Sequence, residues 1–346
     1  MQPVPASLRD NAPRLHYSSD LQPGISRKRS GRGFRYCHPD GRPVTDKKLL
    51  ARIKALAIPP AYTEVWISPS ALGHLQATGR DAKGRKQYRY HDLWQAQRRL
   101  SNYGQLSQFA QALPRIRRRV ARDMAARDLN RDKVAALVVQ LLETTLIRIG
   151  SREYARRNKS YGLTTLKSRH ATLAHGGVRF RFRGKSGVMH DVAVNDRRIA
   201  RAVRRCMELP GQELFQYLDS EGEAHGLDSN TVNAYLKQAS GADFTAKDYR
   251  TWAGSLKAFT ALQHHAEAGP PDRATVVRVV KEVARALNNT PAVCRACYIH
   301  PAIIEAYMAG KLPDKEACSN PRGLRADERR LFAFLARCET IGNTDC

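Results

Sequence analysis

Residues 23–95 alternate between apolar and polar side chains over short runs, which is the pattern of half-buried strands. "YTEVWISP" shows this alternation, and "GFRYCHPDGRPV" places a Pro-Asp-Gly turn between two strand-like arms. "LQATGRDAKGRKQYRYH" is typical of two strands joined by a loop. We therefore expect a small antiparallel β-rich domain over residues 23–95. Residues 1–22 lack the pattern, and we expect them to form a flexible N-terminus.

From residue 96 onward the apolar positions recur with the 3.6-residue period of helices. "TAKDYRTWAGSLKAFTALQHH" begins with Thr245 and Asp248, which are spaced as a helix capping box. Other segments with helical periodicity are "RIRRRVARDMAARDLNRDK", "VAALVVQLLETTLIRIG", "DRRIARAVRRCMEL", "SNTVNAYLKQAS" and "ATVVRVVKEVARALNNT". Residues 96–346 are therefore predicted to form a larger, mostly α-helical domain, which makes the fold class α+β.

One β-hairpin is predicted to interrupt these helices. In "VRFRF", Val178, Phe180 and Phe182 alternate with arginines, and the strand-like "VMHDVAV" follows a Gly-Lys-Ser-Gly turn with Lys185 at its tip. The Gly-Lys-Ser run resembles the end of a phosphate-binding P-loop. However, Arg179 occupies the position of that motif's first glycine, and a strand rather than a helix follows. A lysine at a hairpin tip is often simply solvated, so its role depends on the rest of the chain.

The net charge points to a polyanionic partner. Lys and Arg total 59 against 32 Asp and Glu, which gives a formal net charge of +27. Such an excess repels itself in the folded state unless an anion offsets it, and nucleic acid is the natural candidate. A genome-wide bias toward arginine codons is the alternative, but it would not by itself remove so many carboxylates.

The composition argues against a membrane protein, a disulfide-bonded protein and a metalloprotein. No apolar run approaches the roughly 20 residues of a membrane span, and the N-terminus lacks the apolar region of a signal peptide. We therefore expect a cytoplasmic protein. Seven scattered cysteines do not suggest a disulfide framework. Cys294 and Cys297 form a C-x-x-C with His300 nearby, but no second ligand pair accompanies them, so no metal is expected.

Arg148 breaks the apolar pattern around it. It falls seven residues after Leu141 and eleven after Leu137, so helical spacing places it within the apolar stripe of its segment. A guanidinium directed at the interior is costly unless an anion meets it. A buried carboxylate would satisfy the guanidinium, and so would solvent if the Arg148 side chain extends outward at the helix end. A bound phosphate is the functional alternative.

Arg250 lies one turn into the helix that Thr245 is predicted to cap, and Lys247 lies even nearer its start. Cations are unfavourable at the positive end of a helix unless an external anion is bound there. Phosphate would supply that anion, although a surface-exposed arginine remains the simpler alternative.

"NNTPAVCRACY" predicts a short helix that ends in a tyrosine. Thr290 followed by Pro291 reads as an N-cap and first helical position, and Tyr298 lies about two turns further on. Asn289 stands at the entrance of this helix. A tyrosine in such a place is most often a core residue, so this segment alone does not identify a site.

Taken in order, "LIRIG", "YGLTTL", "RGKSG", "KDYRTWAG" and "NTPAVCRACY" resemble the catalytic domain of type IB DNA topoisomerases. The resemblance is strongest to the small poxvirus-like enzymes and their bacterial relatives. "DAKGRKQYRYH" resembles the DNA-gripping segment of that family's N-terminal domain. The similarity covers residues 23–310, and it is specific because five motifs occur in the family's order.

The resemblance implies a role for each residue singled out above. Arg148 and Arg250 match the catalytic arginines, Lys185 matches the catalytic lysine on its hairpin, and Tyr298 matches the nucleophile. Asn289 stands where the poxvirus enzymes carry a histidine. Both side chains can donate a hydrogen bond to a phosphate oxygen, but asparagine cannot carry a charge.

The resemblance also implies a set of residues that contact DNA, drawn from both domains. They are Lys83, Arg85, Gln87, Tyr88, Tyr90, Tyr154 and Lys247.

The implied activity is relaxation of supercoiled double-stranded DNA by a monomeric clamp that needs neither ATP nor metal. Tyr298 would form a 3′-phosphotyrosine, which stores the bond energy while the free 5′-hydroxyl end rotates before resealing. The arginines would stabilise the charge of the transition state. Lys185, among the arginines of its hairpin, would protonate the leaving oxygen.

Two rival functions remain at this point. A tyrosine site-specific recombinase shares the plan of arginine, lysine, arginine and tyrosine, but it typically has H-x-x-R where this chain has Lys247-Asp-Tyr-Arg250. A non-catalytic basic DNA-binding protein would explain the charge alone. Only the topoisomerase accounts for all the motifs.

Overall fold

The structure is a computed structural model that describes residues 14–95, 103–174, 176–313 and 322–344. The chain divides into two compact units, Met1–Ser101 and Asn102–Cys346. No helix in the described ranges is both long enough and apolar enough to cross a membrane.

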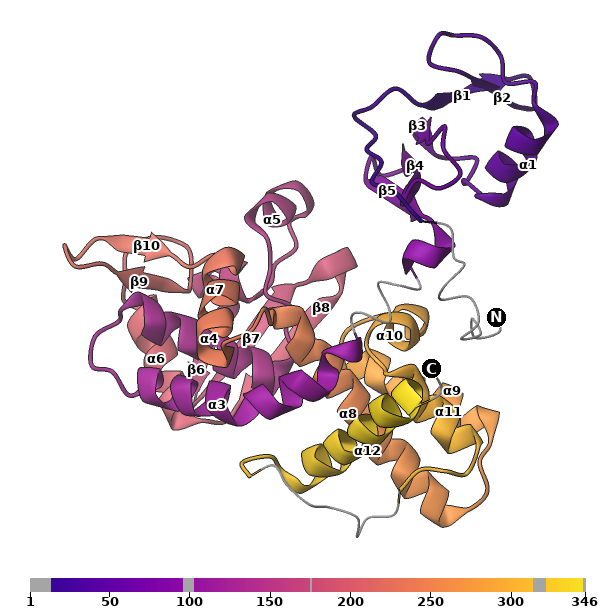
Figure 1. Ribbon diagram of the computed structural model, residues 1–346. Coiled ribbons are helices and arrows are strands. Elements are labelled where there is room, and N and C mark those ends of the chain that lie inside the picture. The colour runs from indigo at the N-terminus through magenta and orange to yellow at the C-terminus, as the bar shows by residue number, and fades with distance from the viewer. Residues whose placement is uncertain (1–13, 96–102, 175, 314–321, 345–346) are drawn as a thin grey trace. The chain divides into compact units, whose positions relative to one another are not determined.

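The smaller unit is built on an antiparallel sheet of strand order β2-β1-β3-β4-β5. Its strands are β1 (Ile25–Ser30), β2 (Gly33–Cys37), β3 (Thr63–Ile67), β4 (Leu75–Arg80) and β5 (Lys86–Tyr90) (Figure 1). The helix α1 (Lys47–Ala55), capped by Asp46, buries Ile53 in the same core as Ile25 and Ile67. The predicted antiparallel β-rich architecture is confirmed, whereas this helix was not predicted.

The sheet also holds part of the segment that we expected to be flexible. His16 bridges to Gly73, the Ser18 hydroxyl donates to the carbonyl of Leu75 at 2.9 Å, and Asp20 pairs with Lys86 on β5. The smaller unit therefore begins before residue 22, because these short polar side chains tie the segment to β4 and β5. Residues 1–13 of the predicted flexible N-terminus lie outside the described residues.

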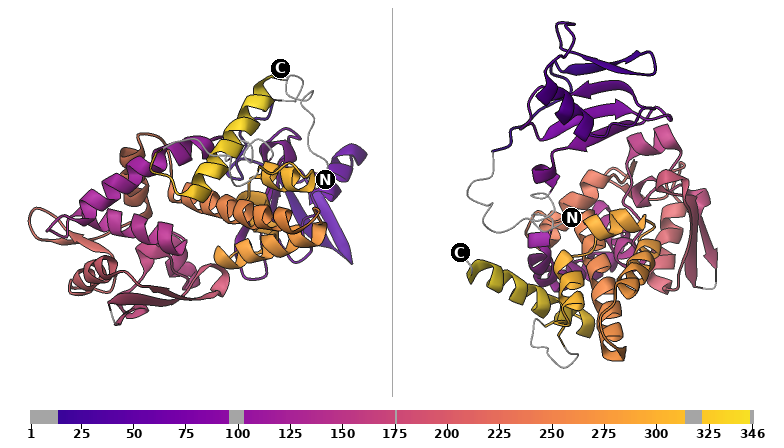
Figure 2. Two further views of the ribbon diagram at one scale, coloured as in Figure 1. Left: turned by 90° about the horizontal axis from the view of Figure 1, so that it is seen from below. Right: turned by 90° about the vertical axis from the view of Figure 1, so that its right-hand side faces the viewer.

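The larger unit is mostly helical, as predicted. Its helices are α3 (Leu106–Met124), α4 (Arg131–Thr145), α5 (Arg152–Asn158), α6 (Arg197–Met207), α7 (Ser229–Ser240), α8 (Ala246–Ala268), α9 (Arg273–Ala286), α10 (Pro291–Cys297), α11 (Pro301–Met308) and α12 (Ala326–Thr344). Thr245 and Asp248 form the predicted capping box at the start of α8, and Thr290 caps α10. Helix α8 packs against α9 and α11, and α9 packs against α10 (Figures 1 and 2).

A three-stranded antiparallel sheet interrupts these helices, in the order β6-β7-β8. Its strands are β6 (Ala171–Ala174), β7 (Gly177–Arg183) and β8 (Met189–Val194), and the short strands β9 (Gln216–Leu218) and β10 (Ala224–Gly226) form a separate ribbon. On β7, Val178, Phe180 and Phe182 are buried while the arginines that alternate with them are exposed, as the alternation predicted. Lys185 lies in the turn between β7 and β8.

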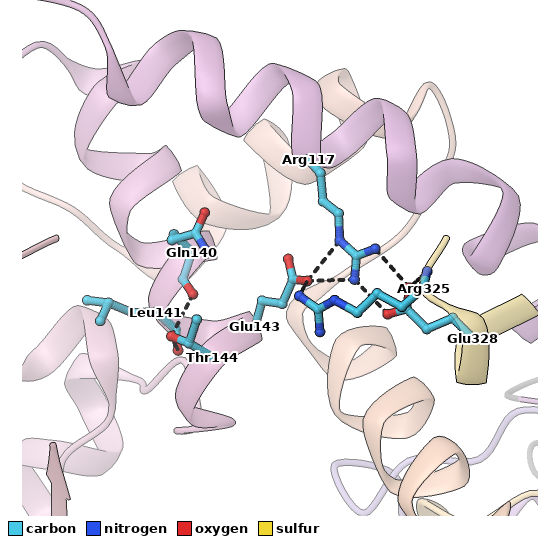
Figure 3. A network of polar contacts seen from close by, with 7 residues as sticks. All are labelled: Arg117, Gln140, Leu141, Glu143, Thr144, Arg325 and Glu328. Carbon is cyan, nitrogen blue, oxygen red and sulfur yellow. Dashed lines mark hydrogen bonds and ion pairs between the residues drawn. The ribbon is translucent and has the colours of Figure 1, made fainter. Parts of the chain in front are cut away.

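A partly buried ion cluster, in which Glu328 is the buried member, fastens α12 to the rest of the larger unit (Figure 3). Arg117 on α3 donates to both carboxylate oxygens of Glu328 at 2.9 and 2.6 Å, and its Nε donates to Glu143 on α4 at 2.8 Å. Glu328 also accepts from the backbone N–H of Arg325 at 2.8 Å. Burial by itself would raise the pKa of Glu328, but the hydrogen bonds from Arg117 and Arg325 outweigh it and hold the pKa below its usual 4.5.

Replacing Arg117 with methionine should destabilise the larger unit by about 3 kcal/mol at neutral pH, because Glu328 would then be buried without its partner. Chemical denaturation of the two proteins measures the difference. Because the pKa of Glu328 is depressed in the folded state, the stabilisation is present above pH 4.5 and is lost as the pH falls below that value. The gap between wild type and Arg117→Met should therefore narrow in acid. Arg157→Met is the matched control, since the Arg157–Glu153 pair is exposed and should contribute little.

Candidate active site

Arg148 lies in an extended segment after α4, not on the helix. Leu146 adopts a left-handed conformation with φ of +56° and ends α4 directly after Thr145. The expectation that Arg148 falls on the helical stripe of Leu137 and Leu141 is therefore wrong. The half-buried guanidinium donates to the carbonyl of Asn288 at 3.0 Å and to the side-chain oxygen of Asn289.

Arg250 lies in the second turn of α8 and is only 4% exposed. Its guanidinium donates to the carbonyl of Leu146 and, at 2.7 Å, to the carbonyl of Leu287. The Nε–H of Arg250 is buried and has no acceptor among the described residues. The sequence left open whether Arg250 binds an external anion or is simply exposed at the surface, and its burial excludes the second alternative.

The loop from Leu287 to Asn289, between α9 and α10, receives both guanidiniums. Arg250 binds the carbonyl of Leu287, and Arg148 binds the carbonyl of Asn288 and the side chain of Asn289. Since arginine can only donate, the side-chain oxygen of Asn289 must face Arg148, which fixes the orientation of its amide. The Nδ2 group of Asn289 is then a buried donor with no acceptor in the described part of the chain.

Tyr298 is the C-cap residue of α10 and is half-buried. The guanidinium carbon of Arg250 lies 5.3 Å from the centre of its ring. Gly254 on α8 allows the tyrosine backbone to approach closely, because a Cβ there would lie 2.5 Å from the Tyr298 carbonyl oxygen. The Ser255 hydroxyl donates to the same carbonyl at 3.3 Å. Helix α8 therefore positions both Arg250 and Tyr298.

The two arginines, one buried and one half-buried, lie close to each other and to the tyrosine. Burial lowers the pKa of Arg250, as does the charge of Arg148, while the Tyr298 phenol opposes the change. Burial likewise lowers the pKa of Arg148, opposed by the phenols of Tyr298 and Tyr154. Both groups still carry their charge near neutral pH. In the part of the chain that the structure describes, their hydrogen-bond acceptors are neutral carbonyl and amide oxygens and neither forms an ion pair, so the cluster is a positively charged site.

Lys185 is exposed in the β7–β8 turn, where Ser186 has φ of +62° and Gly187 has φ of +81°. Among the described residues, its side chain has no hydrogen bond or ion pair with Arg148, Arg250 or Tyr298. The structure therefore gathers Arg148, Arg250, Asn289 and Tyr298, and leaves Lys185 on the adjacent hairpin.

The predicted DNA-contact residues of the smaller unit lie on β5 and the turn before it. Tyr88 and Tyr90 are 49% and 39% exposed, and their rings are stacked with centroids 6.1 Å apart. Arg85 and Gln87 both donate to Asp81, at 2.8 and 3.0 Å. The hydrogen bond from Arg85 is the main reason that the pKa of Asp81 falls to about 2.

Of the remaining predicted DNA-contact residues, two are exposed and one is half-buried. Lys83 is exposed in the β4–β5 turn, and Lys247 is exposed in the first turn of α8. Tyr154 is half-buried on α5, close enough to Arg148 to influence its pKa.

Two features of the site were missed from the sequence. One is that the guanidiniums of Arg148 and Arg250 donate to backbone carbonyls, those of Leu146, Leu287 and Asn288. A pattern of side chains cannot predict a bond to a backbone carbonyl. The other is His190 on β8, which is 5% exposed and lies near both arginines. The sequence did contain a signal for it. His190 alternates with Val192 on the apolar face of the predicted second strand of the hairpin, and it pairs with Phe182 on the first.

Comparison with known proteins identifies the family. The family described as "Eukaryotic DNA topoisomerase I, catalytic core" matches residues 90–317, and "Bacterial DNA topoisomerase IB, N-terminal domain" matches residues 33–81. DNA topoisomerase 1B of Acanthamoeba polyphaga mimivirus is 31% identical over 297 residues, which are 83% of this chain and 88% of the viral protein.

Two poxvirus proteins are more distant relatives. DNA topoisomerase 1B of Vaccinia virus (strain Copenhagen) is 23% identical over 248 residues, covering 70% of this chain and 75% of its own. DNA topoisomerase 1 of Rabbit fibroma virus (strain Kasza) is 22% identical over 326 residues, covering 88% and 99%. The resemblance seen in the sequence motifs is confirmed: this chain belongs to the type IB DNA topoisomerases.

Proposed function

We propose that the chain relaxes supercoiled duplex DNA by cutting one strand with Tyr298, letting the broken end rotate, and resealing it. The observation that carries this proposal is a pair of buried donors for which the described residues offer no acceptor: Arg250 Nε, beside Tyr298, and Asn289 Nδ2, beside Arg148. An unpaired buried donor is costly. A phosphate drawn into the cluster would supply acceptors for both donors and a counter-charge for Arg148 and Arg250.

The cluster suits the electrostatics of phosphoryl transfer. Negative charge spreads over the non-bridging phosphate oxygens in the transition state. Two guanidiniums, already held by backbone carbonyls, are preorganised to bind those oxygens. Asn289 adds a neutral donor. Because these side chains supply the charge that a metal ion would otherwise provide, the proposed reaction needs no metal.

The proposed reaction exchanges one phosphate ester for another. The Tyr298 oxygen bonds to phosphorus while the bond to the 5′ oxygen breaks, leaving a 3′-phosphotyrosine and a free 5′-hydroxyl. Lys185 donates a proton to the departing 5′ oxygen, and the proton lost by the tyrosine passes to water. Religation reverses each transfer. No ATP is required, because the covalent intermediate retains the energy of the original ester.

We also propose that both units grip the same duplex, as a monomeric clamp. The exposed Tyr88–Tyr90 stack, Lys83, Arg85 and Gln87 would contact DNA from the smaller unit, and Tyr154 and Lys247 from the larger one. The net charge of +27 supports extensive phosphate contacts, which makes binding strong and dependent on salt.

Supercoiled plasmid incubated with the protein in EDTA and without ATP should become relaxed. Tyr298→Phe should bind linear duplex as wild type does, yet lose both relaxation and the covalent protein–DNA adduct, because the phenol oxygen is the nucleophile. Gel electrophoresis with and without a denaturant measures both products. Relaxation by Tyr298→Phe, or a requirement of the wild type for Mg²⁺, would contradict the proposal.

Lys185→Ala should slow single-turnover cleavage by about 10²- to 10⁴-fold, the usual contribution of a general acid. When sulfur replaces the bridging 5′ oxygen, the loss should be much smaller, because a thiolate leaves without protonation. Arg181→Ala, on the same hairpin and 66% exposed, is the control and should show no preference for the sulfur substrate. A Lys185→Ala defect that is equally large on both substrates would remove Lys185 from the acid role.

A further inference from the structure

His190 occupies a position where the strand pattern calls for an apolar side chain. It lies opposite Phe182 in the β7–β8 pairing, and the two rings stack with centroids 4.6 Å apart and an interplanar angle of 13°. The imidazole is almost fully buried at 5% exposure. A histidine in such a place must be satisfied by specific partners, because an unpaired buried polar group is costly.

One partner of the imidazole belongs to the loop that holds the arginines. The Nδ2 group of Asn288 lies 3.2 Å from Nδ1 of His190. An amide nitrogen only donates, so Nδ1 is the acceptor and the proton of the neutral ring resides on Nε2. Asn288 has φ of +48°, and its backbone carbonyl accepts from Arg148.

The other side of the imidazole contacts the turn that carries Lys185. A Cβ placed on Gly184 would lie 2.4 Å from Nε2 of His190, so the backbone just before Lys185 lies directly against the ring. The turn is closed by hydrogen bonds from Gly184 to Val188 at 2.7 Å and from Gly187 to Gly184 at 3.0 Å. The imidazole is therefore in contact with both the turn that carries Lys185 and the loop from Leu287 to Asn289.

The surroundings keep this histidine neutral. Burial, followed by the charges of Arg148 and Arg250, lowers the pKa of His190 to about 4. At neutral pH the ring thus has the free lone pair that Asn288 requires, and it adds no third positive charge to the cluster.

We propose that His190 is a positioning residue that fixes the turn bearing Lys185 against the Asn288–Asn289 loop, so that the lysine and the arginines act on the same phosphate. The inference rests on the proposed function, since it assigns the Lys185 hairpin its placement relative to the reacting atoms. Among the described residues, the Lys185 side chain has no hydrogen bond or ion pair with a partner at the arginine cluster. The imidazole contacts the turn at Gly184 and accepts from Asn288, whose carbonyl in turn accepts from Arg148.

The test uses two variants that break the same contact from opposite sides. His190→Phe keeps a ring to stack on Phe182 but offers no acceptor, and Asn288→Gly removes the donor while tolerating the positive φ. Both should slow single-turnover cleavage of an ordinary phosphodiester at least tenfold and slow cleavage of the 5′-bridging sulfur substrate much less, as expected if Lys185 is misplaced. His190→Asn, which retains an acceptor near the position of Nδ1, should restore most of the rate.

Two further measurements separate positioning from simple loss of structure. The double variant His190→Phe/Asn288→Gly should be no slower than the worse single variant, because the two changes remove one contact. His170→Phe is the matched control, a partly buried histidine whose Nδ1 accepts from the Lys167 backbone at 3.1 Å, and it should show no preference for the sulfur substrate. If His190→Phe fails to fold by thermal melting, Asn288→Gly alone decides the question.

The possible outcomes are distinct. Equal loss on both substrates, or no loss, in folded His190→Phe and Asn288→Gly would overturn the inference while leaving the proposed function intact. Cleavage by Tyr298→Phe would instead overturn the proposed function. A third outcome is that the sulfur substrate restores cleavage by Lys185→Ala but not by His190→Phe or Asn288→Gly. That result would retain Lys185 as the general acid and would overturn only the positioning role of His190.

Discussion

The larger unit depends on how it buries guanidinium groups, and it does so in two contrasting ways. Arg117 is held by two carboxylates, Glu143 and Glu328, so its charge is neutralised where it lies. Arg148 and Arg250 are held by carbonyl and amide oxygens, which accept from part of each guanidinium but supply no negative charge, and Arg250 Nε has no acceptor among the described residues. The first arrangement fastens helices together. The second costs stability and is worth keeping only where an anion arrives from outside.

This constraint also explains why distant segments converge at the site. The carbonyls that receive the guanidiniums become available only where a helix has ended, because within a helix each carbonyl is already bonded. Leu146 follows the end of α4, and Leu287 and Asn288 follow the end of α9. Tyr298 in turn lies at the end of α10. The candidate site is thus assembled from helix ends, with the long helix α8 supplying Arg250 and the close approach at Gly254.

The sequence predicted the architecture and the candidate residues well, but it did not predict the backbone conformation around those residues or their hydrogen-bond partners. The 3.6-residue period of apolar side chains located the helices of the larger unit, and alternation of apolar and polar side chains located β7 and β8. Both patterns arise because one face of each helix or strand packs against the core. The end of α4 was missed because Leu146 adopts a left-handed conformation that normally favours glycine, and its carbonyl accepts from Arg250, a residue far along the chain. The attachment of α12 through Glu328 and the contact between His190 and Asn288 were also missed, since each joins residues far apart in the chain.

The asparagine at position 289, where the resembling poxvirus enzymes carry a histidine, fits the electrostatics of this site. Burial, followed by the charges of Arg148 and Arg250, lowers the pKa of His190 to about 4, so both the burial and the two charges oppose another positive charge here. A histidine at position 289 would contact Arg148 directly and would face the same opposition to protonation. Asn289 avoids the conflict, because its oxygen accepts from Arg148 while its amide nitrogen remains a donor at every pH. Under the proposed function, a neutral amide would therefore supply a donor to the phosphate without adding a positive charge to the cluster.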